Sequence, residues 1–228
     1  MSVSAAPQKL KAKTKWLYGI GDIGNALVNS SLQFFLMKFY TDAALILPVL
    51  AGNALLVGKI WDAINDPLFG WLTDRTNSKI GKRRVFMLFG AIPLALSVAL
   101  LWFVPPGLSQ VMTFVWIAGT FIFFDSVWTL TNVPYYALTS ELTDDYDERS
   151  SLTVYRMVLA TPAYLIGAAL TPMIVGFFAV QRTGFAVIGI VYGVIAALAL
   201  LISAGGLRER PNVIRSEGEV NPIKSLKE

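Results

Sequence analysis

The sequence predicts an all-α membrane protein in which six transmembrane helices form one bundle. Of its 228 residues, 55% are hydrophobic and only 15% are charged, and the mean hydropathy is +0.58. This balance is too apolar for a soluble domain. A helix needs about 20 apolar residues to cross the hydrocarbon layer of a bilayer, and six stretches of that kind follow one another along the chain.

The predicted spans are residues 16–40, 46–73, 84–104, 110–138, 152–180 and 184–204. The first is too long and too polar for a cleaved signal peptide. Short outer loops, such as "PPGLSQ" and "QRTG", indicate antiparallel neighbours. We expect residues 1–15 to form a cytoplasmic N-terminal segment and residues 16–205 to form the bundle. Residues 206–228, which are polar and charged, are expected to form a cytoplasmic linker.

The 19 Lys and Arg residues outnumber the 15 Asp and Glu residues, for a net charge of +4. Most of the cations precede the first span, lie between residues 75 and 84, or follow the sixth span, whereas the opposite loops contain only Arg182. By the positive-inside rule both termini are cytoplasmic. The basic charge therefore indicates topology in a membrane, which we expect to be a bacterial inner membrane, and it does not indicate a nucleic-acid partner. With no His or Cys and no Gly-rich phosphate loop, no enzymatic constellation is evident.

The second span carries ionisable residues at membrane depth, where each costs roughly 2.5–3.5 kcal/mol. Lys59, Asp62, Asn65 and Asp66 share one side of this helix. Two carboxylates at i and i+4 require a compensating cation, and Pro67 frees the backbone carbonyl of Ala63. Such hard oxygen ligands suit Na⁺, Li⁺ or a proton. The alternative is an Asp–Lys59 salt bridge that only holds helices together.

Polar stripes also mark other spans. The fourth contains Asp125, Thr129, Asn132 and Tyr136, the first contains Asp22, Asn25, Asn29 and Gln33, and the fifth contains Arg156. Three such faces favour a shared aqueous cavity for a small-molecule substrate, although interhelical hydrogen bonding is the common role of Asn and Thr in membranes. Arg156 has two candidate partners, which are Asp125 and an anionic group of the substrate.

The loop "GWLTDRTNSKIGKRR" resembles the signature of the major facilitator superfamily between its second and third spans. The motifs "YGIGD", "FYTD", "WDAINDP" and "VPYYAL" are similar to those of the glycoside–pentoside–hexuronide:cation symporters within it. This resemblance implies that Asp62, Asn65, Asp66 and Thr129 bind the coupling cation, and that Arg156 lies near a sugar. The family has twelve spans in two six-helix halves, so the chain is expected to be the N-terminal half of a major facilitator fold.

The sequence departs from the family's best-known galactoside transporter at the sugar side of the site. That protein has aspartates at the positions of Ala26 and Asn132, a tryptophan at Tyr136 and a lysine at Asn25. The candidate substrate residues are therefore Asp22, Asn25, Asn29, Asp125, Asn132, Tyr136 and Arg156.

We therefore expect alternating-access symport of a sugar or glycoside-like solute, coupled to Na⁺ (or H⁺ or Li⁺) and without another cofactor. The expected partners are membrane lipid and a second six-helix half. A non-transporting assembly or regulatory half-bundle, a homodimerising half-transporter and a lipid-like substrate remain as alternatives.

Overall fold

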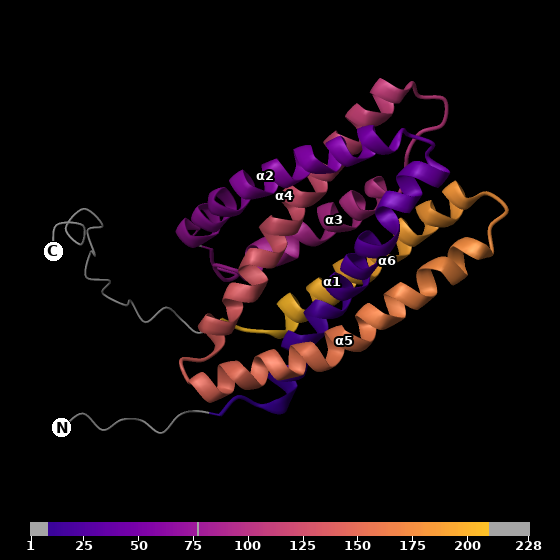
Figure 1. The fold of residues 1–228 in the computed structure, drawn as a ribbon. Helices are drawn as coiled ribbons and strands as arrows, with labels where there is room; N and C mark the ends of the chain where they lie inside the picture. Colours follow the sequence, from indigo (N-terminus) through magenta and orange to yellow (C-terminus); the bar gives the residue numbers. More distant parts are fainter. Residues whose placement is uncertain (1–8, 77, 210–228) are drawn as a thin grey trace, which may run out of the picture.

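The computed structural model describes residues 9–76 and 78–209, and this part of the chain is helical, without strands. It forms α1 (Ala12–Lys38), the π-helical turn η1 (Phe39–Ala43), α2 (Pro48–Arg75), α3 (Arg84–Leu101), α4 (Gln110–Leu142), α5 (Tyr146–Gly176) and α6 (Gln181–Gly206). The helices lie side by side in an elongated bundle (Figure 1). The greater part of the predicted linker, from residue 210 onward, lies outside the described residues.

Each predicted span coincides with one helix, and the ends differ by a few residues. The fifth helix begins earlier than expected, because the Asp145 side chain caps it by accepting the Glu148 backbone N–H at 2.9 Å. Ser109 caps α4 in the same way, through the N–H of Met112. Such caps satisfy backbone donors that would otherwise lack a partner at a helix start.

Four of the described helices, α3 to α6, are long and apolar enough to cross a membrane by length and composition. Helices α1 and α2 have sufficient length, at 27 and 28 residues, but they carry polar residues such as Asp22, Lys59 and Asp62. The class of helical membrane protein is therefore confirmed. The count of six spans remains a prediction, and the two helices in question bear several of the candidate site residues, among them Asp22, Asn65 and Asp66.

The helices pack in the order α5, α1, α6, α3, α4, α2 across the bundle, because the chief contacts are α1 with α5 and α6, α3 with α6 and α4, and α2 with α4. If the labels α1 and α4, α2 and α5, and α3 and α6 are exchanged in this list, the same five contacting pairs result. The bundle is therefore built from two three-helix units with equivalent packing. Helices α2 and α5 lie at its opposite edges (Figure 1).

Small residues allow the closest helix contacts. A Cβ atom on Gly24 of α1 would lie 2.2 Å from the Cα of Ala196 on α6, so these backbones touch, as is common between membrane helices. Gly70 of α2, the first residue of the signature stretch, makes no such contact, because no described atom of a neighbouring element lies within 4 Å of a Cβ built there.

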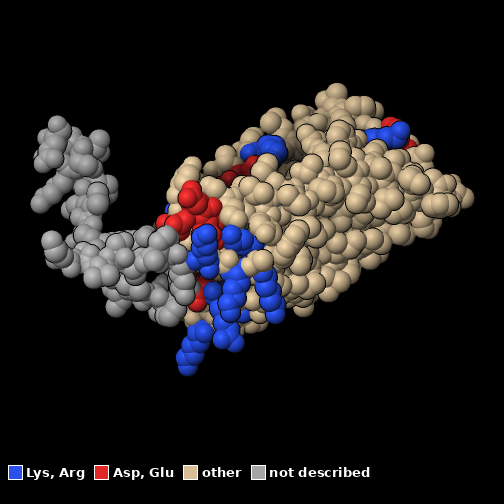
Figure 2. All heavy atoms as spheres, turned by 90° about the horizontal axis from the view of Figure 1, so that it is seen from below, with Lys and Arg blue, Asp and Glu red and all other residues tan. Residues whose placement is uncertain are grey.

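The signature loop is tied to the end of α6. The Glu209 carboxylate accepts the backbone N–H groups of Lys82, Arg83 and Arg84 at 2.7–2.9 Å. Gly81 makes this approach possible, since its φ of +125° disfavours other residues and a Cβ there would lie 2.6 Å from the Glu209 carboxylate. The Arg83 guanidinium also pairs with Asp74 at 2.6 Å. Loop and helix end are thus joined at the end of the bundle where both termini leave (Figure 1) and where Lys and Arg gather (Figure 2).

Candidate cation and substrate sites

The structure divides the predicted site residues into two polar clusters. The first, the α2–α4 cluster, consists of Lys59, Asp62, Asn65, Asp66, Asp125 and Thr129. The second, the α1–α4–α5 cluster, consists of Asp22, Asn25, Asn132, Tyr136 and Arg156. The residues expected to bind a cation thus lie on facing helices, and most of those expected to bind substrate lie around α1.

Asn65 is the centre of the α2–α4 cluster and is fully buried. Its side-chain amide nitrogen lies 3.0 Å from the Thr129 hydroxyl, and 3.1 Å from both the carboxylate and the backbone oxygen of Asp125. The Thr129 hydroxyl in turn donates to an Asp66 carboxylate oxygen at 3.0 Å. Contacts between α2 and α4 therefore bring together residues some 60 positions apart in the chain.

The Asn65 side-chain oxygen is buried and has no hydrogen-bond partner among the described residues. Leaving a buried acceptor unsatisfied costs about 1–3 kcal/mol, so this oxygen is suited to accept a ligand. Close to it in sequence, Pro67 lies inside α2 and cannot donate to the carbonyl of Ala63. The cluster itself offers hard oxygens of three kinds: carboxylate, amide and hydroxyl.

Oxygen ligands of this kind suit a hard cation such as Na⁺. The described residues contain no group of three or more His, Cys, Asp or Glu that could hold a metal ion. The four residues Asp62, Asn65, Asp66 and Thr129 instead supply carboxylate, amide and hydroxyl oxygens.

Lys59 forms an ion pair with Asp62 at 3.1 Å, and the two side chains are 65% and 33% exposed. Both residues belong to α2, so the pair does not hold two helices together, in contrast to the alternative considered from the sequence. An exposed ion pair contributes little stability. Lys59 is therefore a local counter-ion of Asp62 within α2.

Asp125 lies in the α2–α4 cluster, although the sequence grouped it with the candidate substrate residues. It is 5% exposed, accepts a hydrogen bond from Asn65, and is close enough to Asp62 for their charges to interact. Its stripe on α4 divides, because Asp125 and Thr129 face α2, whereas Asn132 and Tyr136 face α1. Sequence spacing on one helix did not show this division.

Arg156 on α5 pairs with Asp22 and not with Asp125. Its Nε lies 3.6 Å from an Asp22 carboxylate oxygen, and its guanidinium carbon lies 4.9 Å from the centre of the Tyr136 ring. Asp22 also accepts hydrogen bonds from Asn25 at 3.2 Å and from the Tyr136 hydroxyl at 3.4 Å. This arrangement presents a carboxylate, a phenol and a guanidinium together, and Tyr136 is 43% exposed.

Two of the candidate substrate residues serve interhelical packing. Asn25 donates to the Asn132 side-chain oxygen, and each residue is 4% exposed. Their mutual bond joins α1 to α4, as the alternative of interhelical hydrogen bonding proposed. Asn29 is exposed on α1 and belongs to neither cluster. Further along α1, Gln33 accepts a hydrogen bond from the Tyr164 hydroxyl of α5.

Sequence reasoning missed the tyrosines beneath the second cluster. The Tyr135 hydroxyl donates to the backbone oxygen of Tyr18 at 2.7 Å, and the two rings stack with centres 5.0 Å apart. The Tyr18 hydroxyl also shares a hydrogen bond with Thr139 at 2.7 Å. Tyr18 precedes Asp22 by four residues, so extending the α1 stripe by one turn would have included it.

The fold and the polar clusters define a class, namely membrane transporters built from helical bundles. Residues 17–227 match the family described as MFS/sugar transport protein. The chain belongs to this family of the major facilitator superfamily, as a member of its glycoside–pentoside–hexuronide:cation symporter type. The expectation of a chain from a symporter family, which is a family of transporters and not of enzymes, is thereby confirmed.

Three relatives illustrate the range of the family. The chain is 38% identical, over 92% of its length, to an uncharacterized symporter, sll1374, of Synechocystis. It is 29% identical, again over 92% of its length, to the isoprimeverose transporter of Lactiplantibacillus pentosus. It is 32% identical, over 74% of its length, to the sodium-dependent lysophosphatidylcholine symporter 1 of Xenopus tropicalis. The aligned regions cover 40%, 44% and 32% of these relatives, so the chain spans less than half of their length.

Proposed function

We propose that the chain is the N-terminal six-helix half of a cation-coupled symporter and that it carries the site for the coupling cation. The observation that supports this proposal most directly is that Asn65 is buried with its side-chain oxygen unpartnered, while its side-chain nitrogen and the Asp66 carboxylate both contact Thr129. Na⁺ is the proposed ion, with H⁺ and Li⁺ as alternatives. The name of the sodium-dependent relative supports Na⁺.

Cation binding would act on the carboxylates. A cation held by Asp62, Asn65, Asp66 and Thr129 offsets the negative charge of the pair at i and i+4, and so lowers the cost of closing low-dielectric surroundings over it. Because Asn65 and Asp66 contact Thr129, the ion would also fix α2 against α4. In a transporter of two six-helix bodies, such a change at the midplane biases the rocking of one body against the other.

The substrate site is proposed to lie at Asp22, Tyr136 and Arg156. These side chains offer both hydrogen-bond acceptors and donors, which a sugar hydroxyl group can use together. The isoprimeverose transporter among the relatives supports a sugar or glycoside. The lysophosphatidylcholine symporter supports a lipid-like substrate as the alternative.

The proposed architecture has six membrane crossings, both termini in the cytoplasm, a bundle at residues 16–205, and flanking segments at 1–15 and 206–228. The proposed partner is a second six-helix body, either a C-terminal half or another copy of the chain. A half-bundle that has an assembly or regulatory role and does not transport is the alternative.

Reconstitution into proteoliposomes tests the function. An inward Na⁺ gradient is applied, and uptake of radiolabelled glycosides or lysophosphatidylcholine is measured for the chain alone and for the chain with a candidate C-terminal half. We expect Na⁺-stimulated uptake that Asp66→Cys abolishes and that Asp42→Cys, outside both clusters, preserves.

Uptake that is unchanged by Asp66→Cys would reject the cation site. Uptake by the chain alone would show that two copies suffice. The absence of uptake in both preparations, with Na⁺ binding intact, would favour the non-transporting alternative.

A further inference from the structure

A cavity of about 390 Å³ opens at the end of the bundle where both termini leave. Its lining comes from the start of α1, the last turn of α4 and the end of α6, and consists of Lys9, Leu10, Lys11, Thr14, Leu142, Gly206, Leu207 and Arg208. None of these residues belongs to either polar cluster. The cavity is therefore separate from the proposed transport site.

The lining of the cavity is positively charged. Lys9, Lys11 and Arg208 line it, and none of them forms an ion pair within residues 9–76 and 78–209. Several other cations at this end do have partners. Lys15 lies 2.9 Å from Glu148, and Arg84 donates to the backbone oxygen of Ala204.

Three positive charges that line the same cavity repel one another, and an anion bound between them offsets this repulsion. At the start of α1, Lys11 provides no side-chain cap and the first turn contains no acidic residue, while the Glu148 carboxylate of α5 is engaged by the Leu10 N–H at 3.0 Å and by Lys15 at 2.9 Å. The free N–H groups of a helix start favour an anion. The combination of three exposed cations around an open volume therefore fits a ligand with a compact negative group.

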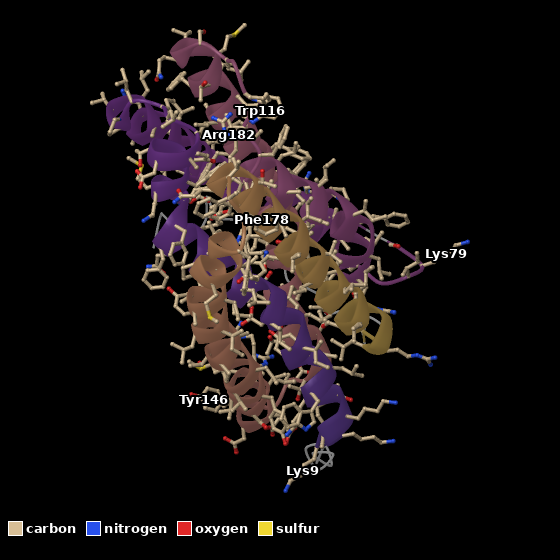
Figure 3. The ribbon with its side chains drawn as sticks, turned by 90° about the vertical axis from the view of Figure 1, so that its right-hand side faces the viewer. Lys9, Lys79, Trp116, Tyr146, Phe178 and Arg182 are labelled. Atoms are coloured by element: carbon tan, nitrogen blue, oxygen red, sulfur yellow. The ribbon has the colours of Figure 1, made fainter. Side chains whose placement is uncertain are left out.

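The other wall of the cavity is apolar. Leu142 and Leu207 are 4% and 1% exposed and support it together with Leu10. Exposed aromatic residues occur at the same end, namely Trp16 at the start of α1 and Tyr146 at the start of α5; Figure 3 shows Tyr146 at the same end as Lys9. Trp and Tyr are enriched where a membrane protein meets the headgroup layer.

We propose that this cavity binds the phosphate headgroup of an anionic phospholipid. The volume corresponds to roughly a dozen water molecules at about 30 Å³ each, which is enough for a phosphoglycerol group. Basic pockets between helices on the cytoplasmic side of membrane proteins bind such headgroups. A lipid held here joins the ends of α1, α4 and α6.

The test measures phosphatidylglycerol binding to the purified, delipidated 228-residue chain by native mass spectrometry. The cavity variant combines Lys9→Gln, Lys11→Gln and Arg208→Gln. The control variant combines Lys13→Gln, Lys79→Gln and Lys82→Gln, which removes the same charge outside the cavity; Figure 3 shows Lys79 far from Lys9. We expect at least about tenfold weaker binding to the cavity variant and near-wild-type binding to the control.

Circular dichroism checks that both variants retain their helices. Binding of phosphatidylcholine, and competition by inorganic phosphate, distinguish an anionic lipid headgroup from a free anion as the ligand. We expect phosphatidylcholine to bind more weakly than phosphatidylglycerol, and we expect inorganic phosphate not to displace bound phosphatidylglycerol. Equal weakening in both variants, or equal binding of the two lipids, would overturn the proposal in favour of general surface attraction. Displacement by inorganic phosphate at similar concentration would overturn it in favour of a free-anion site.

Discussion

At the scale of single residues, Asn65 shows what the sequence predicts and what it does not. Its place beside Asp62 and Asp66 follows from helical spacing alone. Its contacts with Asp125 and Thr129, at 3.0–3.1 Å, follow from the packing of α2 on α4, which no pattern within one helix specifies. For the same reason the sequence did not show that Asp125, a candidate substrate residue, contacts Asn65.

The two clusters predict separable effects of two acid-to-amide changes. Asp125→Asn should weaken Na⁺ binding by roughly tenfold, because a buried charge next to Asn65 is lost, and should leave substrate binding nearly unchanged. Asp22→Asn should weaken substrate binding, because it removes the anionic partner of Arg156. Isothermal titration with each ligand checks both variants.

One result would contradict the assignment of Asp125 to the cation cluster. If Asp125→Asn impairs substrate binding and spares Na⁺, Asp125 belongs with the substrate residues, as the sequence suggested.

At the scale of helices, each predicted span coincides with one helix. Among the described helices, α3 to α6 are apolar enough to cross a membrane by length and composition, whereas α1 and α2 carry polar residues, so the six crossings stay a prediction. The helix ends were less accurate, since caps such as Asp145 and the π-helical turn η1 depend on local hydrogen bonds. The tie between Glu209 and the signature loop was not predicted, because Glu209 lies more than 120 residues from its partners.

The contact between α1 and α6 predicts a sharp difference between two glycines. Gly24→Ala should lower the free energy of unfolding by about 1–3 kcal/mol, because a Cβ there meets the backbone of Ala196. Gly52→Ala on α2 meets no atom within 4 Å and should be neutral or slightly stabilising. Thermal unfolding in detergent measures both, and equal stability of the two variants would exclude the close contact.

The Glu209 tie makes a prediction about local motion. Glu209→Ala should accelerate amide hydrogen exchange at residues 82–84 by roughly tenfold or more, because these N–H groups lose a charged acceptor. Glu141→Ala serves as the control, since Glu141 only approaches Arg83 at 4.0 Å. Unchanged exchange in Glu209→Ala would show that the tie does not persist in solution.

At the scale of the whole molecule, the helix order and the equivalence of the two three-helix units emerged only from the structure. The sequence contains no evident short repeat that would reveal the two units. The helix order is also not specified by composition, because one apolar helix face can pack equally well on several others. Charge predicts an orientation that stays a prediction here, although the cations do gather at one end of the bundle (Figure 2).

Orientation is testable by labelling, because the chain has no native cysteine. In right-side-out cells, Val180→Cys, in the outer connection between α5 and α6, should react with a membrane-impermeant maleimide. Lys79→Cys, in the signature loop, should react only after the membrane is opened. The reverse pattern would invert the proposed topology.

The central claim is that facing residues of α2 and α4 bind a monovalent cation. Equilibrium binding of ²²Na⁺ to the purified chain tests it most directly, with Asp66→Asn compared with Asp42→Asn. The account predicts saturable binding that Asp66→Asn removes and Asp42→Asn retains. Saturable binding that is equally strong in all three proteins would contradict it, as would the absence of saturable binding in the unaltered chain.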